Sequence, residues 1–150
     1  MPGRRGDVFV ADRENSRVQV FTAAGAHKAT WLSRASTAMN RAVYSRHVSS
    51  ITYHPSLDLF AVTEGDSVVL RTPSGCDVWD AAGLRWPHDA VLMPEVVANG
   101  GLAVNRSGLA VDGAQIAVYV AELDGKRISK LVTRGAGNGG GRGDNPYGRA

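Results

Sequence analysis

The sequence has one cysteine, Cys76, and no unbroken apolar run near the roughly 20 residues that a membrane-spanning helix needs. A lone cysteine cannot form an internal disulfide, so cysteine usage does not assign the protein to an oxidising or a reducing compartment. Residues 1–6 lack the apolar segment of a signal peptide. The net charge is only +3, and no lysine or arginine run is long enough for a phosphate-binding stripe. The sequence therefore predicts neither a membrane segment nor a nucleic-acid interface.

Helical periodicity is weak throughout, and the apolar residues instead form short runs rich in valine, isoleucine, phenylalanine and tyrosine. Turn-forming residues such as glycine, asparagine and proline separate these runs, as they separate strands. The pattern therefore predicts an all-β protein. The predicted strands are 8–11, 17–21, 48–53, 59–63, 67–71, 89–93, 117–121 and 127–132. Residues 29–42 fit no strand pattern clearly, and we expect a loop or a short helical turn there.

An internal repeat is the most informative feature of the chain. Residues 8–21 align without a gap on residues 118–131, an offset of 118 − 8 = 110. Each copy has an apolar strand, an acidic residue, a polar turn, an arginine and a second strand with alternating apolar residues, which predicts a β-hairpin. Residues 59–70 form a looser third copy. Since Arg17 recurs as Arg127, we expect both arginines to be structural.

Hairpin repeats of this kind are typical of β-propellers, in which short antiparallel sheets surround an axis. The mean spacing of the copies, about 55 residues, exceeds that of known blades, so we expect an insertion at about residues 94–113. A chain of 150 residues is too short for a whole propeller. The sequence therefore predicts a partial propeller over residues 1–133, with two blades plus part of a third. It predicts a Gly-rich disordered tail over residues 134–150. A plain β-sandwich of unrelated hairpins is the alternative.

Three blocks of sequence resemble the NHL-repeat propeller of the peptidyl-α-hydroxyglycine α-amidating lyases. They are residues 10–21, residues 46–55 followed by 60–62, and residues 86–91, in the order that the family has. The resemblance covers roughly residues 7–133 and implies a six-bladed parent, of which this chain would be a C-terminal fragment. It also implies an activity, the cleavage of peptidyl-α-hydroxyglycine to a C-terminal peptide amide and glyoxylate.

The family binds a catalytic zinc ion on three histidines and a structural calcium ion in the channel. The resemblance matches His88 to one zinc histidine, Asp89 to the calcium-binding aspartate, and Arg13 to an arginine that binds the substrate carboxylate. In a propeller the first strand of each blade lines the central channel, so a histidine at the start of such a strand can point at the axis. The alternatives are a turn histidine at position 88 and an arginine that, with Asp12 and Asn15, only shapes a turn.

Several family residues have no counterpart in this sequence. By the resemblance, the other two zinc histidines, a tyrosine and a second arginine would precede Met1. Animal relatives carry cysteines at the positions of Phe9 and Val20, so a disulfide across that hairpin is absent. We expect the three remaining histidines to lie on the surface: His27, His47 and His54.

The resemblance also implies a setting for the protein. The location would be the secretory pathway or the extracellular space, and a peptidylglycine monooxygenase would be a partner or a further domain. The alternative function is that of a non-catalytic NHL-repeat propeller, which acts as a protein-interaction scaffold.

Overall fold

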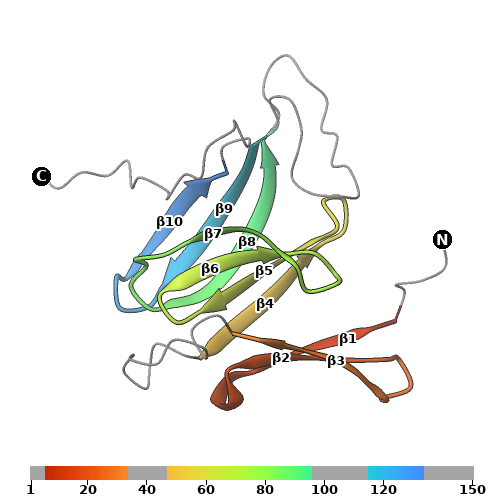
Figure 1. The fold of residues 1–150 in the computed structure, drawn as a ribbon. Helices are drawn as coiled ribbons and strands as arrows, with labels where there is room; N and C mark the ends of the chain where they lie inside the picture. The colour runs from red at the N-terminus through yellow and green to blue at the C-terminus, as the bar shows by residue number, and fades with distance from the viewer. Residues whose placement is uncertain (1–5, 34–46, 96–114, 134–150) are drawn as a thin grey trace, which may run out of the picture.

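The computed structural model describes residues 6–33, 47–95 and 115–133, which form ten β-strands and one short 3-10 helix (Figure 1). The strands make three antiparallel sheets that follow one another along the chain. The N-terminal sheet contains β1 (Val8–Asp12), β2 (Arg17–Phe21) and β3 (His27–Leu32), with η1 (Arg13–Asn15) between the first two. The central sheet contains β4 (Val48–His54), β5 (Leu59–Glu64), β6 (Ser67–Arg71) and β7 (Asp77–Ala81). The C-terminal sheet contains β8 (Pro87–Glu95), β9 (Gln115–Glu122) and β10 (Arg127–Val132).

The repeated segments fold as equivalent hairpins, which confirms the interpretation of the repeat. Asp12 lies opposite Arg17 where β1 turns into β2, and Glu122 lies opposite Arg127 where β9 turns into β10. The looser copy forms the hairpin of β5 and β6. β1, β5 and β9 are therefore the same strand of three successive units.

Strand pairing shows which part of each unit is present. β5 pairs with β4 on one edge and β6 on the other, and β9 pairs in the same way with β8 and β10. Within the described residues, β1 pairs only with β2. The N-terminal sheet thus holds the second to fourth strands of a unit, and the C-terminal sheet holds the first three. The expected partial β-propeller is present as one four-stranded blade between two three-stranded blades.

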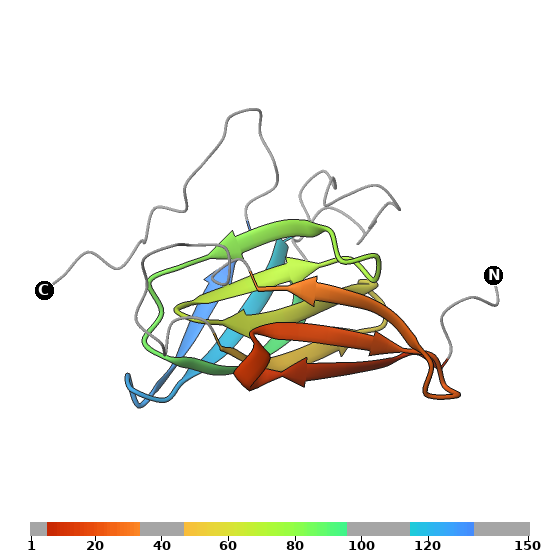
Figure 2. The same ribbon diagram turned by 60° about the horizontal axis from the view of Figure 1, so that its bottom comes forward.

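The central sheet lies between the other two, as Figure 2 shows, and is covered on both faces. All six residues of β5 are buried, because its alternating side chains enter two different cores. On one face Phe60 packs with Val18 and Trp31 of the N-terminal sheet. On the other face Leu70 packs with Val118 of the C-terminal sheet. The face-to-face packing of successive sheets is the packing of propeller blades.

The first strands of the central and C-terminal sheets, β4 and β8, lie against each other. The hydroxyl of Thr52 in β4 is 3.5 Å from Asp89 Oδ1 in β8. Both strands run upwards in Figure 1, so their starts lie at corresponding ends of the molecule. This contact marks the side on which a propeller has its axis.

All eight predicted strands are present, with bounds that differ by at most two residues, but the sequence does not predict β3 or β7. β3 begins before residues 29–42, where a loop or helical turn is expected, and includes the first of them. Only Trp31 is buried in it, so its sequence lacks a regular apolar alternation. β8 continues through Pro94 and Glu95, the first two residues of the expected insertion. Residues 96–113 and the tail, residues 134–150, lie outside the described residues.

Among the described residues, no helix has the length and apolar character to cross a membrane.

Candidate functional site

Asp12 organises the turn between β1 and β2. Its carboxylate accepts hydrogen bonds from Arg17 Nε at 2.7 Å, Asn15 Nδ2 at 2.8 Å and Gln19 Nε2 at 2.9 Å. The hydrogen bonds from Arg17 and Asn15 hold the pKa of Asp12 below its ordinary value. Arg17 therefore has the structural role that its recurrence predicts, and the turn is fixed by side-chain contacts as well as by its backbone.

Arg13, in the same turn, has no carboxylate contact within the described residues as short as that of Arg17. Its side chain is 43% exposed, and its contact with a carboxylate among the described residues is a long one, 4.0 Å from Nε to Glu14 Oε1. At that distance a surface ion pair is weak. The guanidinium of Arg13 is thus accessible to a ligand, while that of Arg17 is held by Asp12.

The Arg13 turn lies beside the start of β4. Glu14 Oε2 is 3.9 Å from His47 Nε2, and His47 is the residue that precedes β4. Figure 1 shows η1 next to this end of β4. Since β4 is a first strand, the turn is placed at the end where the channel strands begin.

His88 and Asp89 lie at the start of β8, the first strand of the C-terminal sheet. Both are exposed, and the pairing of β8 with β9 shifts register between Pro87 and Asp89. Such a bulge changes the direction in which side chains point. Asp89 Oδ1 accepts a hydrogen bond from the N–H of Ala90 at 2.9 Å in addition to its contact with Thr52. The structure thus places both residues on the strand nearest the expected axis.

The described residues do not complete a metal site. They contain no group of three or more histidine, cysteine, aspartate or glutamate side chains that could hold a metal ion. A catalytic zinc site usually has three protein ligands and one open position, and His88 supplies one. Asp89 likewise offers a single carboxylate where calcium takes six to eight oxygen atoms. Within the described residues, neither metal has the ligands that it needs.

Of the other three histidines, one lies on the surface as expected and two are partly buried. His27 is exposed at the start of β3, where its Nε2 is 3.0 Å from Thr30 Oγ1. The expected surface position is wrong for the remaining two. The side chain of His47 is 13% exposed, and His54 is half-buried with an Nδ1 atom that has no hydrogen-bond partner among the described residues. Burial follows from their places at the two ends of β4, which is packed between its neighbours.

Sequence reasoning did not find the buried arginine Arg71. It is 2% exposed, its Nη2 is 3.3 Å from Glu64 Oε2, and its Nε donates to Asp77 Oδ1 at 2.5 Å. A buried arginine needs such partners because an unpaired buried charge is costly. The repeat offered a signal for Arg71, because the equivalent positions of the other two copies carry apolar residues, Phe21 and Leu131.

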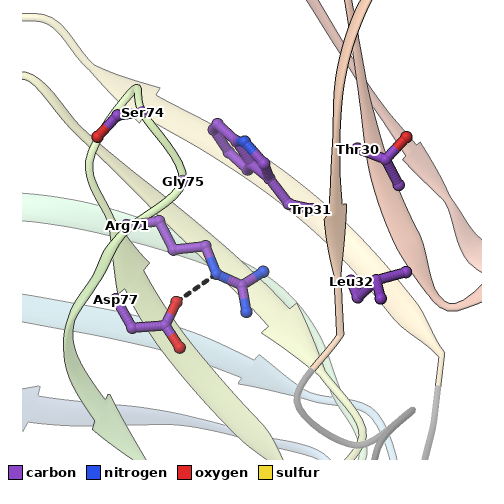
Figure 3. A pocket seen from close by; sticks show the side chains of 7 residues that line it. All are labelled: Thr30, Trp31, Leu32, Arg71, Ser74, Gly75 and Asp77. Carbon is purple, nitrogen blue, oxygen red and sulfur yellow. Dashed lines mark hydrogen bonds and ion pairs between the residues drawn. The ribbon is translucent and has the colours of Figure 1, made fainter.

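A shallow pocket of about 570 Å³ opens beside this arginine, between β3 and the turn from β6 to β7 (Figure 3). Arg71 Nη1 is buried there without a hydrogen-bond partner among the described residues. The lining residues are Thr30, Trp31, Leu32, Arg71, Ser74, Gly75 and Asp77. The pocket lies at the outer strands of two sheets, away from β8 and its histidine.

One family model matches this chain, that of the NHL repeat, over residues 3–21. The matched segment includes β1, η1 and β2, and therefore Arg13. No curated protein matches the chain. The matched repeat and the three packed antiparallel sheets identify the chain as part of a β-propeller that contains an NHL repeat.

Proposed function

We propose that this chain is part of a lyase that cleaves peptidyl-α-hydroxyglycine to a peptide amide and glyoxylate, and that Arg13 binds the carboxylate of the substrate. The observation that carries the proposal is the contrast between two arginines of one turn. Arg17 Nε is held by Asp12 at 2.7 Å, whereas Arg13 Nε lies 4.0 Å from Glu14 Oε1, beside the start of a first strand. The NHL repeat at residues 3–21 supports the propeller in which such a residue would face the channel.

The reaction needs an anchored carboxylate and a proton transfer. The hydroxyl of the α-hydroxyglycine loses its proton, its oxygen forms the carbonyl of glyoxylate, the C–N bond breaks, and the amide nitrogen gains a proton. A guanidinium can hold a carboxylate through two parallel N–H donors, which fixes both the position and the orientation of the reacting carbon. Arg13 would supply this contact, and it would keep the leaving glyoxylate bound through the same oxygens.

His88 and Asp89 are the residues of this chain that we assign to the metals of the proposed lyase. His88 would be one zinc ligand, and Asp89 one calcium ligand. Because the described residues do not complete either site, we assign no step of the reaction to a metal. By the same resemblance we propose a location in the secretory pathway or outside the cell, and a peptidylglycine monooxygenase as the source of the substrate.

The test is a kinetic comparison of variants made in the full-length natural polypeptide to which these residues belong. Glyoxylate release from a peptide ending in α-hydroxyglycine is measured for the unchanged protein, Arg13→Ala and Glu14→Gln. Loss of a bidentate charged contact should cost about 3 kcal/mol of transition-state stabilisation, roughly a 100-fold fall in kcat/KM. Glu14→Gln, in the same turn, should be close to unchanged. Equal kinetics for the Arg13→Ala variant would return Arg13 to a turn-shaping role.

A propeller scaffold without catalysis is the second candidate. It is favoured by the lack of any three-ligand metal group among the described residues. The same assay separates the two functions, because a scaffold releases no glyoxylate from the peptide whether or not zinc is added.

A further inference from the structure

The pocket between β3 and the turn from β6 to β7 is lined by Arg71, whose side chain is 2% exposed. Arg71 lies on the face of the central sheet that packs on the N-terminal sheet, since its cross-strand partner Phe60 packs with Trp31 there. Its Nε donates to Asp77 and its Nη2 contacts Glu64, whereas Nη1 has no hydrogen-bond partner among the described residues. Figure 3 shows the guanidinium pointing from β6 toward β3. A buried N–H group without an acceptor costs free energy, so an acceptor on a ligand would be favoured there.

The charges around Arg71 disfavour an anion as that ligand. Asp77 alone balances the charge of the guanidinium, and Glu64, which is also 2% exposed, adds a second carboxylate. A carboxylate or phosphate on the ligand would bring a further negative charge close to these two. Repulsion between like charges is strong where side chains are shielded from water. The acceptor that suits Nη1 is therefore a neutral oxygen, such as a carbonyl.

The opposite wall of the pocket is β3, and it offers main-chain groups to a ligand. Ser33 N–H donates to Ser16 O at 2.9 Å, and this bond with the register of β2 and β3 fixes which groups of β3 face β2. These groups alternate in an antiparallel pair, so Trp31 faces β2, whereas Thr30 and Leu32 direct their N–H and C=O groups away from it. Among the described strands, β3 is the edge of its sheet. Because Thr30 and Leu32 line the pocket, their carbonyls can accept N–H groups of a ligand.

We propose that this pocket binds a primary carboxamide. The carbonyl oxygen of the carboxamide accepts a hydrogen bond from Arg71 Nη1, and its NH2 group donates to a main-chain carbonyl of β3. The volume of about 570 Å³ is within the range of small-molecule sites, and Leu32, 60% exposed, offers an apolar contact to the rest of the ligand. Two kinds of peptide carry this group, those with a glutamine or asparagine side chain and those with a C-terminal amide. Neither the pocket nor its ligand takes part in the proposed lyase reaction.

Trp31 also lines the pocket and supplies a local readout of binding. The full-length natural polypeptide is labelled with 5-fluorotryptophan, and the fluorine NMR resonance of Trp31 is assigned by its loss in Trp31→Phe. One probe is N-acetylleucinamide, which has a terminal carboxamide, and the other is N-acetylglutamine N-methylamide, which has a side-chain carboxamide. We expect at least one probe to shift this resonance in a saturable titration in the millimolar range. The probe that binds more tightly identifies the source of the carboxamide.

Matched ligands test each half of the proposed contact. N-acetylleucine and N-acetylglutamate N-methylamide replace the carboxamide of each probe by a carboxylate, and both should bind at least about tenfold more weakly because of the two carboxylates beside Arg71. N-acetylleucine dimethylamide keeps the carbonyl but has no N–H at that end, and it should also bind about tenfold more weakly. A carboxylate or a dimethylamide that binds as tightly as its carboxamide would overturn the proposal.

A pair of variants tests the role of Arg71. Arg71→Lys keeps a positive charge near Glu64 and Asp77 but removes Nη1, so carboxamide binding should weaken by about tenfold. Arg85→Lys is the matched control, because Arg85 lies beside Glu122 of the C-terminal sheet, and its binding should be unchanged. Equal binding by Arg71→Lys, or no shift of the tryptophan resonance with either carboxamide, would overturn the proposal.

The ligand series on the unchanged protein gives an answer even if Arg71→Lys does not fold. None of these measurements depends on glyoxylate release, so this proposal and the proposed lyase can fail separately.

Discussion

Glu122 Oε1 accepts a hydrogen bond from Arg127 Nε at 2.9 Å, in the C-terminal hairpin, just as Asp12 accepts one from Arg17 in the N-terminal hairpin. The two pairs occupy the same place in the repeat, at the end of the second strand of a unit. The side chain of Glu122 is fully buried, whereas that of Asp12 is 20% exposed. The same contact is therefore more strongly coupled to folding in the C-terminal sheet.

The first prediction concerns the pH dependence of stability. Burial of Glu122 opposes its ionisation, but hydrogen bonds from Arg127, from Ser129 and from a backbone N–H outweigh it and hold the pKa of the carboxyl below its ordinary value of 4.5. A carboxyl whose pKa is lowered by folding stabilises the fold above pH 4.5, and this contribution declines as the pH falls through the folded-state pKa.

The free energy of unfolding, measured by denaturant titration from about pH 7 to about pH 3, should thus fall more steeply for the unchanged chain than for Glu122→Gln. Equal slopes would show that folding does not lower the pKa of this carboxyl.

The second prediction uses two glycines with the same backbone conformation. Gly75 and Gly83 have φ angles of 88° and 82°, where a side chain is strained. A Cβ atom at Gly75 would lie 2.5 Å from Trp31 Nε1, whereas one at Gly83 would meet nothing within 4 Å. Gly75→Ala should therefore lower the free energy of unfolding by about 1–3 kcal/mol more than Gly83→Ala, because the buried indole must move. Equal losses in urea titrations would mean that the turn does not pack on Trp31.

The third prediction is that the 150-residue chain alone does not retain zinc. The described residues offer His88 as the one zinc ligand expected from the family, whereas a catalytic zinc site usually needs three. After one equivalent of zinc and exhaustive dialysis, bound metal measured by atomic absorption should be near zero and unaffected by His88→Ala. Retention of one equivalent that is lost in His47→Ala or His54→Ala would show that these half-buried histidines complete a site.

Sequence reasoning succeeded where a strand carries its own pattern. The hairpins of β1 with β2 and of β9 with β10 were predictable because apolar residues alternate on either side of a polar turn. It failed for the outermost strands β3 and β7, which bury few residues and so have no strong alternation. The burial of Arg71 between two carboxylates also depends on the packing of sheets, which no local pattern records.

The candidate site was likewise only partly predictable from the sequence. The family resemblance singled out Arg13, His88 and Asp89 from the sequence. Two contacts near them, Glu14 with His47 and Thr52 with Asp89, join different sheets. Contacts between sheets follow from tertiary packing, so they could be learned only from the fold.

The central claim is that neighbouring sheets are consecutive blades whose first strands meet at one axis, and the 3.5 Å contact between Thr52 Oγ1 and Asp89 Oδ1 tests it most directly. In a Cys76→Ser background, the pair Thr52→Cys and Asp89→Cys should form an intramolecular disulfide on mild oxidation, because these two side chains meet where β4 and β8 lie against each other. Thr52→Cys with Lys126→Cys, in the β9–β10 turn, is the control and should remain reduced. A disulfide within single chains of the first pair only, measured by mass spectrometry, is the predicted result. Free thiols in that pair, in a chain that retains its strands, would contradict the propeller arrangement.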